Sequence, residues 1–290
     1  MQNDFNQFNI KKKQIEKLSI IGWIVVGVGG IIAFALQNSA VMYVGFVALF
    51  VGFVIAMKAT TDFKKLSNRF KDEVLVNMFK ELMPGTVYNP YQGLSEYEVY
   101  GTEFLKRADR FYSEDYISGV LEDVKFISSD VRLEERHVEH TKNGTRTYYV
   151  PYFVGRVFKF SFNKEFDGYL QVLEAGSPLS NRGFKKVQLE SIQFNKKFRT
   201  FTTDELSAFY VLTPDIIEAI IHLEERNPGR IGLSFTGDVL YIAINNNKDT
   251  FELKMYREID NSLVEEFKQD LLVIKDVISA MKLNNRLFKK

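Results

Sequence analysis

The sequence predicts an α+β protein: an N-terminal two-helix transmembrane hairpin, followed by a soluble domain with a mostly antiparallel sheet and flanking helices. Three observations predict this fold. Residues 19–57 contain no Asp, Glu, Lys, Arg or His. From about residue 116, apolar and polar residues alternate, as in half-buried strands. Strand-like and helix-like segments form separate runs instead of alternating, which favours α+β over α/β.

Composition excludes several classes of protein. The chain has 290 residues, 46% hydrophobic and 26% charged, with a net charge of +1, so it is neither disordered nor collagen-like. It has no cysteine. Disulfide scaffolds, thiolate nucleophiles and Cys-ligated metal sites are therefore excluded.

Two apolar runs inside the charge-free stretch are each long enough to cross a bilayer. Residues 20–36 would form a helix of about 26 Å and residues 40–57 one of about 27 Å, at ~1.5 Å per residue. Gln37, Asn38 and Ser39 suit a tight turn between them. We therefore expect an antiparallel transmembrane hairpin rather than one buried core helix.

Small residues recur at helical spacing in both runs. They are Gly22, Gly29 and Ala33 in the first, and Gly45, Ala48, Gly52 and Ala56 in the second. Such stripes let helix backbones approach closely in lipid. They could join the two helices of one hairpin, or join copies of the chain into a homo-oligomer.

Positive charge flanks the hairpin on its open side. Lys11, Lys12, Lys13 and Lys17 precede the first span, and Lys58, Lys64, Lys65 and Arg69 follow the second. By the positive-inside rule this predicts a multi-pass protein of the cell (inner) membrane with both termini cytoplasmic. The candidate lipid-headgroup contacts are Lys11, Lys12, Lys13, Lys64, Lys65 and Arg69, although a topology signal alone would explain the same charges.

Four segments are predicted along the chain. They are a cytoplasmic N-terminal segment (1–18), the transmembrane hairpin (19–57), an amphipathic connecting helix (58–83) and a cytoplasmic α+β domain (84–290). The connecting helix has apolar residues three or four apart and stops at Pro84-Gly85. It could be a stalk or lie on the membrane surface.

Strand and helix signals divide the α+β domain. Strands are predicted near 117–127, 131–140, 152–162, 169–174, 187–194, 230–235, 238–244 and 251–256. Asn143-Gly144 and Thr236-Gly237-Asp238 each predict a hairpin turn. Helices are predicted at about 95–109, from Thr202 to Tyr210, from Thr213-Pro214 to Asn227, and from Leu263 to Met281.

No pattern of residues indicates catalysis or cofactor binding. His137 and His140, three apart in a predicted strand, would point to opposite faces and so make a poor metal pair. A phosphate-binding loop and a nucleophile elbow are absent from the sequence. We therefore predict no catalytic, cofactor-binding or metal-binding residues. The α+β domain has a net negative charge, which disfavours nucleic-acid binding.

Several segments resemble an uncharacterised bacterial membrane-protein family, the domain of unknown function 3137. They are Gly155–Phe160 with Phe162–Gly168, Phe194–Phe198, Ala208–Pro214 and Ile231–Ile244. The resemblance covers roughly residues 95–256, and the paired apolar runs also resemble that family. It implies a bacterial membrane protein with a cytoplasmic domain, and it supplies no catalytic residue or cofactor.

We expect a membrane-anchored cytoplasmic binding or scaffold module. The expected partners are the lipid bilayer and a protein partner, or a second copy through the hairpin. Two alternatives stay open: an enzyme acting on a membrane-proximal substrate, and an accessory subunit of an oligomeric pore or transporter. Neither apolar span contains an ionisable residue to line a pore.

Overall fold

The protein is described by a computed structural model that covers residues 2–35, 40–142, 144–180, 182–281 and 283. The chain divides into two compact units. Unit 1 comprises Met1–Met78 with Phe251–Glu266, and unit 2 comprises Phe79–Thr250 with Phe267–Lys290. The predicted turn at 37–39 and the residue Asn143 lie outside the described residues. The α+β fold class is confirmed.

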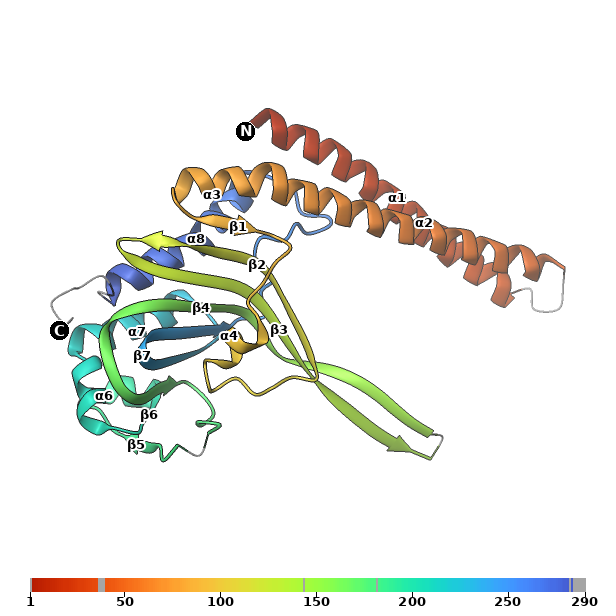
Figure 1. Cartoon of the computed structure of the whole chain (residues 1–290). Coiled ribbons are helices and arrows are strands. Elements are labelled where there is room, and N and C mark those ends of the chain that lie inside the picture. Colours follow the sequence, from red (N-terminus) through yellow and green to blue (C-terminus); the bar gives the residue numbers. More distant parts are fainter. Residues whose placement is uncertain (1, 36–39, 143, 181, 282, 284–290) are drawn as a thin grey trace. The chain divides into compact units, whose positions relative to one another are not determined.

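Unit 1 is built on two long helices that run antiparallel, α1 (Gln2–Ala35) and α2 (Val41–Phe70) (Figure 1). A π-helical segment, Lys71–Leu75, continues α2 into α3 (Val76–Leu82). The helical stretches Phe5–Ala35 and Val41–Leu82 each contain a long, strongly apolar segment. The two predicted apolar helices are confirmed, and both are long enough to cross a membrane.

Glycine backbones set the distance between α1 and α2. A Cβ atom on Gly29 would lie 2.7 Å from the backbone nitrogen of Leu49, and one on Gly45 would lie 2.5 Å from that of Ala33. Such distances are shorter than van der Waals contact, so only glycine fits there. The small-residue stripes therefore pack the two helices of one chain against each other.

The hairpin has small residues inside and large apolar residues outside. Within the second span, the buried residues are Gly45, Gly52 and Ala56. By contrast, Phe34 is 78% exposed and Phe50 is 69% exposed. In water this arrangement would expose a large apolar surface, whereas hydrocarbon solvates it without cost.

The predicted connecting helix is a continuation of the second span. The helical stretch Val41–Leu82 has 42 residues, about 63 Å at ~1.5 Å per residue. It ends two residues before Pro84, as the sequence predicts. The residues of the predicted connecting helix therefore continue the apolar helix without a break.

The segment 251–259 is not the predicted strand but an irregular strap, and within unit 1 it lies along α1. The side chain of Asn9 donates to the carbonyl oxygen of Ile259 at 2.7 Å and accepts from its backbone N–H at 2.9 Å. The backbone N–H of Tyr256 donates to Glu16 at 2.8 Å, and its hydroxyl donates to Ser19 at 3.2 Å. These side chains satisfy the backbone groups that a sheet partner would otherwise have satisfied.

Unit 2 contains an antiparallel sheet. Its strands are β1 (Val87–Asn89), β2 (Arg110–Leu121), β3 (Val124–Thr141), β4 (Gly144–Leu173), β5 (Lys185–Val187), β6 (Arg199–Thr202) and β7 (Arg230–Asn245). The order is β1-β2-β3-β4-β6-β5, with β7 on the other edge of β4. Thus β3 pairs with the first part of β4, and β6 pairs with its last part.

The hairpin predicted at Thr236-Gly237-Asp238 is wrong, because β7 is one strand. Both halves of β7 pair with β4, from Gly155↔Asn245 to Leu173↔Gly232. The pairing register shifts between Ser161 and Tyr169, opposite Gly237, whose φ is +54°. Glycine allows this left-handed residue inside a strand, so the pair of strands bends without reversing.

A two-stranded arm extends from the sheet (Figure 1). It is formed by the second half of β3 and the start of β4, which pair from Glu134↔Pro151 to Thr141↔Gly144. This confirms the hairpin predicted around Gly144, whose φ is +135°. The ring of His137 stacks on Tyr148 at 5.5 Å.

The other helices are α4 (Glu96–Tyr100), α5 (Ile192–Lys197), α6 (Glu205–Val211), α7 (Pro214–Arg226) and α8 (Asn261–Ala280). The predicted strand at 187–194 is wrong: β5 ends at Val187, and Ser191 caps α5 by accepting from the Phe194 N–H at 3.3 Å. Asp204, not Thr202, caps α6. The part of the core of unit 2 that packs against α4 includes Leu133, Phe153 and Val157.

Two glycines of α1 offer a matched test of the hairpin packing. We expect Gly29→Ala to destabilise the protein by about 1–3 kcal/mol, because the new methyl group overlaps the α2 backbone. Gly27 has no atom near its Cβ position, so Gly27→Ala should be neutral or slightly stabilising. Thermal unfolding in detergent measures both, and equal effects of the two substitutions would contradict the packing.

Candidate functional site

The predicted lipid-headgroup residues lie in unit 1, on the helices just beyond the apolar spans. Lys11, Lys65 and Arg69 line a groove of about 310 Å³ between α1 and α2, with Asp62 also on its wall. Arg69 forms an ion pair with Glu73 that raises the pKa of the guanidinium. Lys64 is exposed on the same helix.

The other two predicted residues have partners inside unit 1. Lys12 is 2% exposed and forms an ion pair with Glu16 one turn along α1. Lys13 lies 3.5 Å from Glu258 of the strap. The Glu16 partner of Lys12 stands at the local spacing i,i+4, whereas the Glu258 partner of Lys13 is distant in sequence and could not be predicted from it.

Unit 2 buries a group of charged side chains that the sequence did not identify. Arg156 of β4 lies opposite Asp130 of β3, and its Nε donates to the Asp130 carboxylate at 2.7 Å. The second oxygen of Asp130 accepts from the backbone N–H of Thr250 at 2.6 Å. Burial raises the pKa of Asp130, and the Arg156 charge opposes that rise.

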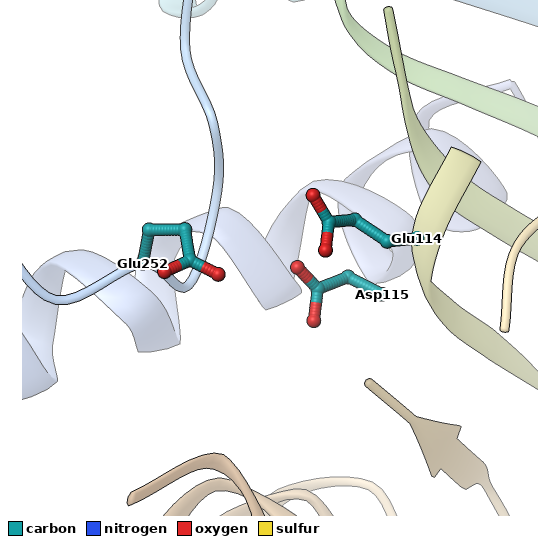
Figure 2. Close-up of side chains that lie close together, drawn as sticks. All are labelled: Glu114, Asp115 and Glu252. Carbon is teal, nitrogen blue, oxygen red and sulfur yellow. The ribbon is translucent and has the colours of Figure 1, made fainter. Parts of the chain in front are cut away.

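Asp115 lies beside this ion pair at a bulge of β2. Its φ is +55°, a left-handed conformation that aspartate tolerates better than most residues. It is fully buried and accepts a hydrogen bond from the hydroxyl of Tyr88, whose pKa is raised by burial and by the Asp115 charge. Figure 2 shows Asp115 and its neighbour Glu114 at the bulge; the third labelled side chain, Glu252, belongs to unit 1.

Among the described residues of unit 2, Asp115, Asp130 and Asp249 form a group that could hold a cation. Each offers an oxygen atom, and these atoms lie within 4.8 Å of one another. However, Asp130 already binds a guanidinium and a backbone N–H. Asp130 is thus engaged in an internal ion pair of the sheet, with Arg156 as its cation.

A polar cavity of about 450 Å³ adjoins the ion pair. Asp130, Arg132, Glu134 and Lys248 are among its lining residues. Arg132 donates to Glu134 at 2.7 Å, and Lys248 lies 3.9 Å from Asp270. Much of its charge is therefore paired within unit 2.

Unit 2 also contains an apolar groove of about 680 Å³. Its lining includes Leu189, Phe209, Leu212, Ile217 and Ile221, from the segment before α5 and from α6 and α7. A 71° bend between α6 and α7 forms one corner. This groove is a candidate binding site of unit 2, because its size and apolar lining are typical of ligand sites.

Local sequence explains both walls of the groove. The side chain of Asn195 on α5 holds the backbone of Leu189, accepting from its N–H at 3.1 Å and donating to its carbonyl oxygen at 2.6 Å. On α7, Ile220 and Leu223 are buried in unit 2, whereas Ile217 and Ile221 line the groove. No site was predicted here from the sequence; the signal that indicates it is the apolar arc of α7, which is too wide for one packing face.

The buried ion pair gives a test of how unit 2 is stabilised. Arg156→Met leaves Asp130 buried without its cation, which should cost about 3–5 kcal/mol near pH 8. The loss should be smaller near pH 5: the variant raises the folded-state pKa of Asp130 further, so stability is greatest when the carboxyl is protonated and falls as pH rises. Denaturant unfolding at the two pH values checks this, and a loss independent of pH would contradict it. The double variant Arg156→Met, Asp130→Leu should recover most of the stability.

Comparisons with known proteins agree with the resemblance in part of the chain. Residues 152–283 match a protein family of unknown function, DUF3137. The match begins later and ends later than the stretch 95–256 in which the sequence resembles the family. No curated protein matches the chain.

One solved structure is similar at low identity. It is the crystal structure of the mycobacterial trehalose monomycolate transport factor A, TtfA, with a TM-score of 0.38 and 6% sequence identity. The similarity covers 67% of this chain and 88% of that one. The family match is the more informative comparison: residues 152–283, from within β4 to just beyond α8, are similar to the DUF3137 family.

Proposed function

We propose that this protein is a membrane-anchored binding module. In this proposal α1 and α2 span the inner membrane of a bacterium, both termini are cytoplasmic, and unit 2 binds a protein partner through its apolar groove. The observation that carries it is the hairpin with small residues inside and large apolar residues outside. A helix pair of this kind needs a hydrocarbon solvent.

The distribution of charge supports the orientation. The apolar part of α2 is followed by Lys58, Lys64 and Lys65, and that of α1 is preceded by Lys11 and Lys17. Lysine near the ends of a span favours the cytoplasmic side. The groove of unit 2 supports a binding role, because it is apolar, of ligand size and lined from three neighbouring segments.

We further propose that Lys11, Lys64, Lys65 and Arg69 contact the headgroups of anionic lipids. Lys64 and Lys65 lie seven and eight residues beyond Met57, about 10–12 Å along the helix, so their long side chains can reach back to the headgroup layer. Lys12 is left out of this proposal because it is buried beside Glu16. Lys13 is left out because it lies beside Glu258 of the strap and does not line the groove, whereas Arg69, although paired with Glu73, does line it.

Cysteine labelling tests the orientation cleanly, since the chain has no cysteine. Ala40→Cys lies at the start of α2, and Lys142→Cys lies in the arm; both positions are exposed. In intact bacterial cells, we expect a membrane-impermeant maleimide to label Ala40→Cys and to label Lys142→Cys only after lysis. Labelling of Lys142→Cys in intact cells would contradict the proposed orientation.

The headgroup groove is tested by the anionic lipid that the purified protein retains. We expect each of Lys11→Gln, Lys65→Gln and Arg69→Gln to weaken retention about fivefold, since one well-placed cation contributes about 1 kcal/mol. The matched controls Lys125→Gln, Arg136→Gln and Lys142→Gln remove exposed cations of unit 2. Native mass spectrometry measures the bound lipid, with added inorganic phosphate as competitor to distinguish a lipid site from a free-phosphate site. Equal losses in the two sets would refute the groove.

A further inference from the structure

The apolar groove of unit 2 has an acidic rim. Glu190, Glu218 and Glu225 are among its lining residues, and none of the described lining residues is a lysine or an arginine. We propose that the groove binds a basic amphipathic helix of a partner protein. This inference rests on the proposed function, in which the groove is the binding surface, and it adds the chemistry of the partner.

The floor of the groove suits the apolar face of a helix. Pro214, Ile217 and Ile221 follow one another at spacings of three and four along α7, so they form a stripe about 10 Å long. Phe209 of α6 is 47% exposed beside this stripe. Leu206, one turn before Phe209, is 82% exposed and extends the apolar surface beyond the groove. Aliphatic and aromatic anchors at such spacings are what helix-in-groove recognition uses.

The rim supplies the charge complementarity. The side chain of Glu218 is 74% exposed and that of Glu225 is 47% exposed, and both lie beside His222 on the groove side of α7. Lys197, 3.8 Å from Glu225, also pairs with Glu224, so it offsets only part of this acidity. A partner with lysine or arginine beside its apolar face would pair with the rim carboxylates while its apolar face filled the floor.

A membrane surface is the competing occupant, because α6 and α7 together are as apolar as a candidate span, although bent by 71°. The acidic rim argues against it. Bacterial cytoplasmic leaflets carry anionic lipid, and Glu190, Glu218 and Glu225 would be repelled by it and would lose hydration on contact. The same carboxylates attract a basic peptide.

The test uses the full-length protein in nanodiscs of zwitterionic lipid, with empty nanodiscs as the blank. The probe is a labelled synthetic peptide of about 18 residues, roughly five helical turns. Leucines occupy one helix face and lysines the other; two matched peptides carry glutamine or glutamate in place of every lysine. Fluorescence anisotropy measures the dissociation constants.

We expect the lysine peptide to bind about tenfold or more tightly than the glutamate peptide. The double variant Ile217→Ser, Ile221→Ser should weaken its binding about tenfold, because both side chains line the floor. Glu190→Gln with Glu218→Gln should weaken binding several-fold and reduce its dependence on salt. The matched controls, Leu272→Ser and the pair Glu81→Gln, Glu139→Gln, change equivalent residues outside the groove and should leave binding unchanged.

The other outcomes separate this inference from the proposed function. If the glutamine peptide binds as tightly as the lysine peptide and the floor variant weakens both, the groove binds helices but does not select basic ones, and only the inference fails. If the double variant Ile217→Ser, Ile221→Ser changes the dissociation constant of none of the peptides, the groove is not a helix-binding surface. The inference and the proposed function of the groove then both fail. Quenching of Phe209→Trp by lipids brominated in their acyl chains, in a Trp23→Phe background, would show membrane contact and overturn the inference.

Discussion

The close approach of α1 and α2 is the constraint on which the rest of this protein depends. At Gly29 and Gly45 the backbone of one helix lies where a side chain of the other would begin. The interior of the hairpin is thus filled by backbone and small side chains, and the bulky apolar residues have no place except outside. Such a surface is stable in lipid and not in water, so the hairpin is suited to a membrane.

Unit 2 is stabilised by a different device, the pairing of two long strands that bend together. Because β7 follows β4 through the bend, the backbone hydrogen bonds of both strands are satisfied on either side of it. The buried Asp130–Arg156 pair joins β3 to β4 before the bend, and Thr250 attaches the segment after β7 to the same carboxylate. The groove lies on other elements, α6, α7 and the segment before α5, so its residues can be changed without removing this ion pair.

Sequence patterns predicted the elements whose signals are local. The charge-free stretch predicted the apolar helices, Gly144 marked the tip of the arm, and Pro214 marked the start of α7. Gly237 was misread because a glycine between two apolar runs is equally compatible with a turn and with a bulge, and only the pairing of both halves with β4 decides between them. Residues 251–256 were misread because their backbone groups are satisfied by side chains such as Glu16, far away in sequence.

The candidate sites were less predictable for the same reason. The lysines that precede the apolar part of α1 look alike in sequence. In the structure, however, Lys12 and Lys13 are ion-paired, whereas Lys11 lines the groove between α1 and α2. Asp115, Asp130 and Arg156 are brought together by three strands and have no common motif. In the sequence, Ile217 and Ile221 look like core residues of an isoleucine-rich helix. In the structure they line the apolar groove of unit 2 together with Phe209.

The central claim is that α1 and α2 need hydrocarbon around them. The most direct test is to wash membranes that contain the full-length chain with alkaline carbonate and to centrifuge them at high speed. This treatment strips proteins held to membranes by charge. The account predicts that the chain stays in the pellet until detergent is added, whereas its release into the supernatant without detergent would contradict the account.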